Sequence, residues 1–237
     1  MDLGLQGKVA LVTAASKGLG FASAKALVGE GASVAINARD AHRLEEAGAA
    51  LGADVLTLPG DVTDPDVPAL LVAETVERFG ALHVLVANAG GPPNARALDV
   101  DDETLRGAIE ANLLTSVRLV RAALPHLRAA GWGRICLITS SSVKQPIPNL
   151  ATSNTARAGL WGWAKTASHE LIDEGITLNL ACPGLHRTDR IAEAGLSGRL
   201  GDPADFGKVV AFLCSEPAGF ISGAALQIDG AGTLGLL

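Results

Sequence analysis

Short apolar runs alternate with longer segments of helical periodicity along this chain, and that alternation limits the possible folds more than any other feature. Six runs are rich in valine, isoleucine and leucine: KVALVT, ASVAINA, DVLTLPG, LHVLVANAG, GRICLITS and ITLNLACPG. Each is followed by a stretch whose apolar residues recur at helical spacing. Strands that are apolar on both faces and alternate with helices predict a parallel sheet covered by helices on each side.

The fold class follows from this alternation. Helices are expected over residues 18–30, 40–51, 67–79, 101–129, 151–174 and 203–214. We therefore predict an α/β fold of the Rossmann type, a doubly wound parallel sheet in three layers, and a single domain over residues 1–237. A sheet of this kind binds its ligand beyond the carboxyl ends of its strands, so the chemistry is expected in the strand-to-helix loops.

The acidic balance of the chain argues against a nucleic-acid partner. The formal net charge is −6 and the pI is ≈ 5.3, and lysine and arginine do not cluster with aromatic residues. No basic leader with a long apolar segment precedes the first strand, and no run reaches the length that crosses a bilayer. We therefore expect a cytoplasmic protein without nucleic-acid or membrane partners.

The cysteines give no sign of a metal centre or a disulfide framework. Cys136, Cys182 and Cys214 lie far apart in apolar stretches, without the spacing of metal ligands. We therefore predict no metal site, and we interpret the three residues as small buried thiols in a reducing compartment.

The loop after the first predicted strand, TAASKGLG at 13–20, has the composition of a phosphate-binding turn. Gly18 and Gly20 allow the backbone to turn tightly and to approach a pyrophosphate at the N-terminus of the next helix. Small residues at such a turn also serve close packing, so this loop alone is a weak signal.

Further motifs follow in a fixed order. They are GDV at 60–62, ANAG at 87–90, ANLLT around Asn112, ITSSS at 138–142, CPG at 182–184 and IDG at 228–230. With the first loop, they make the chain resemble the short-chain dehydrogenase/reductase family, and most closely its β-ketoacyl-ACP reductase branch, which belongs to fatty acid metabolism. The resemblance implies an oxidoreductase with a nicotinamide cofactor, and a homotetramer or dimer built through the helices at 101–129 and 151–174.

The resemblance also implies which residues hold the cofactor. These residues are Thr13, Ser16, Lys17, Gly18, Leu19 and Gly20 in the first turn, Asp61 and Val62 at the adenine, Asn88, Ala89 and Gly90 along the cleft, and Arg157, Pro183, Gly184 and Thr188 at the nicotinamide end. One departure from the family pattern is Ala14, which stands where the family has its first glycine.

The end of the second predicted strand favours NADP(H) over NAD(H). An NAD enzyme needs a carboxylate there to accept the ribose hydroxyls, and this chain has Ala38. Arg39 follows, and Lys17 and Ser16 precede Gly18, so two cations and a hydroxyl are placed to bind a 2′-phosphate. The alternative is that Lys17 and Arg39 are ordinary solvated charges.

The catalytic positions depart from the family. The resemblance places Ser140 at the serine that polarises the carbonyl, Ser153 at the tyrosine that donates the proton and Arg157 at the lysine, and the chain has no tyrosine at all. A serine hydroxyl is a weaker acid than a phenol and is shorter by a ring, while arginine stays protonated at any useful pH. The predicted proton source is therefore water ordered by Ser153, Arg157 and Asn112.

Two other titratable residues are candidates for the acid that replaces the tyrosine. Lys144 follows SSS and His186 follows CPG, although each is more simply interpreted as an ordinary surface residue. Between Thr188 and Pro203 the chain is short and glycine-containing, which predicts a brief lid over an open cleft.

Two functions remain after these considerations. One is the NADP(H)-dependent reduction of a ketone or a β-ketoacyl thioester of ACP or CoA, and the alternative is an NADP(H)-binding pseudoenzyme that acts as a sensor or an oligomer subunit. A lyase that borrows the oxyanion-stabilising serine is a third, weaker interpretation.

Overall fold

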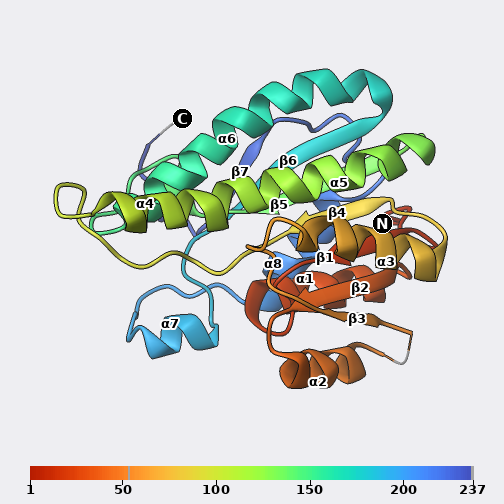
Figure 1. The fold of residues 1–237 in the computed structure, drawn as a ribbon, viewed down its shortest axis with the longest axis horizontal. Coiled ribbons are helices and arrows are strands. Elements are labelled where there is room, and N and C mark those ends of the chain that lie inside the picture. Colours follow the sequence, from red (N-terminus) through yellow and green to blue (C-terminus); the bar gives the residue numbers. More distant parts are fainter. Residues whose placement is uncertain (53, 236–237) are drawn as a thin grey trace.

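One parallel sheet of seven strands organises the computed structural model, which describes residues 1–52 and 54–235 (Figure 1). The strands are β1 (Val9–Val12), β2 (Ser33–Ala38), β3 (Leu56–Pro59), β4 (Val84–Ala87), β5 (Gly133–Ile138), β6 (Ile176–Pro183) and β7 (Ala225–Ile228). Their order is β3-β2-β1-β4-β5-β6-β7, so the direction of winding reverses between β1 and β4. This confirms the doubly wound, Rossmann-type fold.

Helices cover both faces of the sheet (Figure 1). They are α1 (Gly18–Gly29), α2 (Ala41–Leu51), α3 (Val67–Phe79), α4 (Asp102–Ile109), α5 (Thr115–Ala129), α6 (Ala151–Leu171), α7 (Asp189–Glu193) and α8 (Pro203–Leu213). Successive side chains of a strand point to opposite faces, so Leu11 of β1 packs with α3, α5 and α6, while Ala10 and Val12 pack with α1, α2 and α8. The strands are therefore apolar throughout because both faces are buried.

The helix predicted over residues 101–129 is interrupted. A π-helical turn, η1 (Glu110–Leu114), separates α4 from α5. The carbonyl of Glu110 accepts from the backbone N–H of Thr115 and also from its hydroxyl, at 3.0 Å. The hydroxyl thus adds a second donor to the widened turn, which contains Asn112.

Two elements were not among those predicted. The strand β7 adds to the edge of the sheet beside β6, where Leu180 faces Ala225, and α7 lies in the segment that was expected only as a lid. All three cysteines are free and buried, as predicted. Within residues 1–52 and 54–235, no helix combines the length and the apolarity that a membrane crossing requires.

The turn between β1 and α1 is tightly packed. A Cβ atom on Gly20 would overlap the carbonyl oxygen of Ala14, so glycine is required there. Ala14 itself has φ of 47°, a left-handed conformation that costs free energy for any residue with a side chain. Glycine at this position would adopt the same turn without that cost.

Candidate active site

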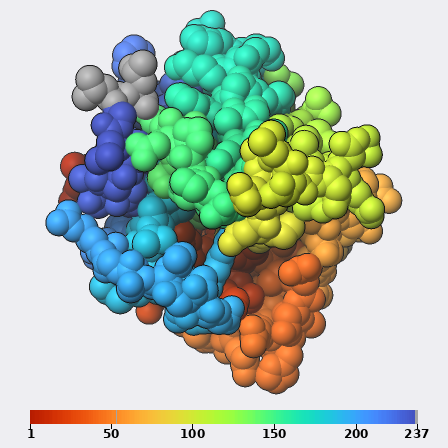
Figure 2. Space-filling model, turned by 90° about the vertical axis from the view of Figure 1, so that its left-hand side faces the viewer, coloured from red at the N-terminus to blue at the C-terminus, as the bar shows by residue number. Residues whose placement is uncertain are grey.

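A cleft of ≈ 870 Å³ lies beyond the carboxyl ends of the strands, beside the point where the winding reverses. Figure 2 shows it as a hollow between the lid (blue), the segment near residue 100 (yellow) and the segment near residue 50 (orange), with N-terminal atoms (red) on its floor. The predicted residues that line it are Ser16, Lys17, Gly18, Leu19, Arg39, Asp61, Val62, Asn88, Ala89, Gly90, Asn112 and Thr188. The structure therefore brings most of the predicted cofactor residues to one surface.

Other predicted residues lie behind that surface. Thr13 is fully buried; its hydroxyl donates to the Asn88 carbonyl at 2.7 Å, and its oxygen accepts from the Asn88 N–H at 2.9 Å. These bonds join the ends of β1 and β4, so Thr13 shapes the wall of the cleft from behind. Gly20, Pro183 and Gly184 are also absent from the lining.

The two cations expected to bind a 2′-phosphate both have carboxylate partners. Arg39 lies 3.7 Å from Asp61, and Lys17 lies 3.6 Å from Asp189 and 4.0 Å from Glu193 on α7. These pairs are solvent-exposed, so each contributes little stability and exchanges its partner at small cost. These acids come from the lid and from the loop after β3, so the linear motif did not show them.

Asp61 remains an anion in the part of the cleft where the adenine is expected. Partial burial opposes ionisation, but hydrogen bonds from the backbone N–H and the hydroxyl of Thr63, together with the charge of Arg39, lower the pKa of Asp61. A further cation, Arg43, lines the same end of the cleft and lies 3.7 Å from Asp40. It was not predicted, and its position in the first turn of α2 after Arg39 was the available signal.

Ser140 lies two residues after the end of β5, which is buried. Its side-chain oxygen accepts from the backbone N–H of Ser142 at 3.1 Å and caps the short 3-10 turn Ser141–Val143. A hydroxyl that accepts in this way keeps its own proton to donate. The proton of the Ser140 hydroxyl is therefore not used by this turn.

Ser153 and Arg157 lie one turn apart on α6, with 7% and 6% of their surfaces exposed. The guanidinium of Arg157 donates to the Ile138 carbonyl at 3.2 Å. Burial, followed by the positive charge of Arg190, lowers the pKa of Arg157 to about 10. Arg157 therefore carries its charge at neutral pH, and neither residue lines the ≈ 870 Å³ cleft itself.

Asn112 is 2% exposed and does line the cleft. Neither its amide nitrogen nor its amide oxygen has a partner among the described residues. Buried amide groups in folded proteins are almost always hydrogen-bonded, to protein or to ordered water. The π-helical turn thus presents an unsatisfied donor and acceptor to the cleft.

Neither replacement acid lines the cleft. His186 is 4% exposed, lies edge-on to Phe206 with ring centroids 5.2 Å apart, and places Nδ1 3.2 Å from the Gly184 carbonyl. It is a packing residue at the base of the lid. The interpretation of His186 as an exposed loop residue is therefore wrong. The Lys144 ammonium lies 5.5 Å from the centre of the Trp161 ring.

Comparisons with known proteins identify the family. Residues 13–233 match a family model described as enoyl-(acyl carrier protein) reductase. The 3-oxoacyl-[acyl-carrier-protein] reductase FabG of Salmonella typhimurium is 34% identical, over 96% of this chain and 98% of its own length. The chain belongs to the short-chain dehydrogenase/reductase family. Dehydrogenase/reductase SDR family member 4 of Homo sapiens is 31% identical, over 95% of this chain and 87% of its own length.

A solved structure of another short-chain dehydrogenase/reductase has the same architecture. The L-sorbose reductase of Gluconobacter frateurii, complexed with NADPH and L-sorbose, has a TM-score of 0.91 and 32% identity, covering 97% of this chain and 98% of that one. The residues of our chain fit a dinucleotide. The N-terminus of its helix α1 has no side-chain cap and faces the cleft with Gly18 and Lys17.

Proposed function

We propose that this chain is an NADP(H)-dependent reductase of a ketone or a β-ketoacyl thioester with an atypical proton supply. The observation that carries the proposal is Asn112, whose buried and unpartnered amide lines the same cleft as the phosphate-binding turn. A buried amide without a protein partner is a site for ordered water, which a reductase without tyrosine needs. The printed names of two relatives, a 3-oxoacyl reductase and an L-sorbose reductase crystallised with NADPH, support carbonyl reduction.

The charges at the adenine end support NADP(H). No carboxylate stands at position 38, while Lys17, Arg39 and Arg43 all line the cleft. A phosphate dianion competes with Asp61 and Asp189 for these cations, and exposed pairs yield to it at low cost. Ser16 adds a hydroxyl donor on the same wall.

In the proposed reaction the bound cofactor supplies a hydride to the carbonyl carbon. Ser140 donates its hydroxyl proton in a hydrogen bond to the carbonyl oxygen, and the fixed charge of Arg157 favours the developing oxyanion. The proton that completes the alcohol comes from water held by Asn112, Ser153 and Arg157. Because no positioned general acid takes part, turnover is expected to be slower than in a tyrosine-dependent relative.

The alternative is an NADP(H)-binding protein without redox turnover, a sensor or an oligomer subunit. It draws support from Ser140, Ser153 and Arg157, none of which lines the cleft that would take the dinucleotide. We also propose a cytoplasmic homotetramer or dimer joined through α5 and α6, where Trp161 and Trp163 are only partly buried. Sedimentation velocity of the purified protein tests the assembly.

One experiment separates the two functions. NADPH consumption is followed with simple ketones and β-ketoacyl thioesters, and with an enoyl thioester because the matching family model is described by that reaction. Calorimetry measures NADPH and NADH binding in parallel. Consumption with a carbonyl compound supports the reductase, binding without consumption supports the alternative, and failure to bind NADPH contradicts both.

A further inference from the structure

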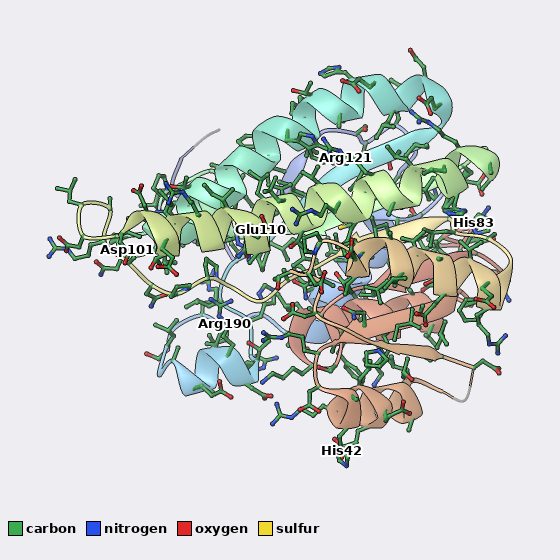
Figure 3. The ribbon with its side chains drawn as sticks, viewed as in Figure 1. His42, His83, Asp101, Glu110, Arg121 and Arg190 are labelled. Carbon is green, nitrogen blue, oxygen red and sulfur yellow. The ribbon has the colours of Figure 1, made fainter. Side chains whose placement is uncertain are left out.

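The lid places one arginine across the cleft. Arg190 extends from α7 to the opposite wall, where its guanidinium lies against the backbone of Gly91 so closely that a Cβ atom there would overlap it. Arg190 lines the cleft together with Asn112. In Figure 3 it lies between α7 and the helix that carries Glu110. Its charge is therefore presented to the cleft.

The charged residues of the lid differ in whether they have an ion-pair partner. Asp189 and Glu193, on either side of Arg190 in α7, pair with Lys17. Among the described residues, no carboxylate lies within ion-pairing distance of Arg190 or of Arg157. The two guanidiniums are close enough for Arg190 to lower the pKa of Arg157. Arg190 thus presents a charge without a carboxylate partner to the cleft, and such a guanidinium favours an anion from solution.

We propose that the substrate is an oxo carboxylate, whose free carboxylate group binds to Arg190. This inference rests on the proposed reductase function. A guanidinium binds a carboxylate through two parallel hydrogen bonds, so it fixes the orientation of the substrate as well as its charge. Asn112 offers a free donor and a free acceptor on the same wall.

The position of Arg190 separates it from the phosphate groups of the cofactor. The pyrophosphate is expected at the N-terminus of α1, beside Gly18 and Thr188, and the 2′-phosphate at Arg39. Arg190 instead meets Gly91, which follows the segment expected to line the cofactor along the cleft. An anion at Arg190 is therefore more consistent with the substrate than with the dinucleotide.

The proposed step is balanced. NADPH would supply a hydride to the carbonyl carbon, and water would supply a proton to the carbonyl oxygen, which yields the hydroxy carboxylate, NADP⁺ and a hydroxide ion that solvent neutralises. The carboxylate keeps its charge throughout, so Arg190 acts in binding and orientation.

Matched neutral and charged ligands test the proposal. Pyruvate, acetoacetate and levulinate are each compared with their methyl esters, by calorimetric binding to the NADP⁺-loaded protein and by kcat and KM with NADPH. At least one acid is expected to bind better than its ester by about 10-fold or more, the worth of a charge-assisted hydrogen bond. Arg190→Gln should remove that preference, Arg190→Lys should restore part of it, and NADPH affinity should stay unchanged.

Arg187→Gln provides the control, because Arg187 directly precedes the lid, pairs with Asp202 and does not line the cleft. It makes the same change in net charge and should keep the preference. Equal binding of every acid and ester overturns the inference while leaving a ketone reductase intact. Loss of NADPH affinity in Arg190→Gln, with no change in the preference, also overturns it and assigns the guanidinium to the cofactor. If no compound is reduced, the reductase fails, and the binding comparison still decides the carboxylate site.

Discussion

The two ends of the cleft region differ in how their charged groups meet solvent. At the phosphate end, the side chains of Lys17 and Arg39 are 46% and 76% exposed and are held by ion pairs. At the catalytic end, Ser153 and Arg157 are almost completely buried, and Arg157 makes a hydrogen bond to a backbone carbonyl. Exposed pairs rearrange at little cost, whereas moving a buried guanidinium disrupts its packing and its hydrogen bond. The cofactor end can therefore adapt to its ligand, while the catalytic end must work with groups as they are placed.

The largest expected effect comes from giving the rigid end the family's own residues. Ser153→Tyr combined with Arg157→Lys should raise reduction of a β-ketoacyl model thioester by up to about 10²–10⁴-fold, the worth of a general acid. Each single change should do much less, because a tyrosine ring beside the buried Arg157 overpacks the site and a lysine alone has no phenol to act on. Steady-state turnover of the three variants measures this.

NADPH affinity and melting temperature serve as controls for that series. A double variant that folds and binds NADPH, yet gains nothing or loses an activity of the parent, would contradict the reductase assignment. Ser153 and Arg157 would then belong to a different mechanism.

Removing the carbonyl donor tests the same end with a smaller effect. Ser140→Ala should lower kcat by about 10²–10³-fold, as loss of an oxyanion donor does, and should leave NADPH affinity unchanged because the proposed reaction uses the hydroxyl at the carbonyl and not at the dinucleotide. Ser141→Ala, in the same short turn, is the matched control. Unaltered turnover in Ser140→Ala would mean that the reaction proceeds without this hydroxyl.

At the exposed phosphate end, Arg39→Ala should weaken the binding of one cofactor only. Loss of a charge-assisted bond to the 2′-phosphate is expected to weaken NADPH binding by about 10–100-fold and to leave NADH binding nearly unchanged. Fluorescence titration with both dinucleotides measures the ratio. Equal losses for the two would show that Arg39 does not contact the phosphate.

The smallest expected effect concerns the turn between β1 and α1. Ala14→Gly should raise the free energy of unfolding by about 1 kcal/mol, because glycine adopts the φ of 47° without the side-chain penalty of about 1–2 kcal/mol. The expected rise in Tm is about 2–4 °C. Ala15→Gly, which lacks a positive φ and is buried, should lower Tm instead. A fall in Tm for Ala14→Gly would show that its methyl group contributes packing that outweighs the strain.

The periodicity of the sequence was enough to predict the sheet and most of its helices, because strands buried on both faces are long apolar runs. It did not predict β7, a four-residue edge strand with only one fully buried residue, or the five-residue α7. Elements this short are held by their neighbours more than by their own pattern.

The site was predictable where a motif carries it, as at Gly18, Asn88 and Asn112. The partners of the charged side chains in the site were not predictable. The contacts of Lys17 with α7 and of Arg190 with Gly91 depend on how the lid folds back over the cleft. His186 was misjudged for the same reason, since its burial comes from Phe206, a residue of α8. Contacts between distant segments have no signature in local spacing.

The π-helical turn at Glu110–Leu114 also fixes the rotation of α4 about the helix axis relative to α5. Each residue of an α-helix advances by about 100° around the axis, so the extra residue in this turn offsets the faces of α4 and α5 by roughly that amount. Deleting one residue between Glu110 and Leu114 would restore a continuous α-helix and rotate α4 as a unit. Glu103, Thr104 and Gly107, which line the cleft from α4, would turn away from it together. The width of a single turn therefore decides which side of α4 the cleft presents to its ligand.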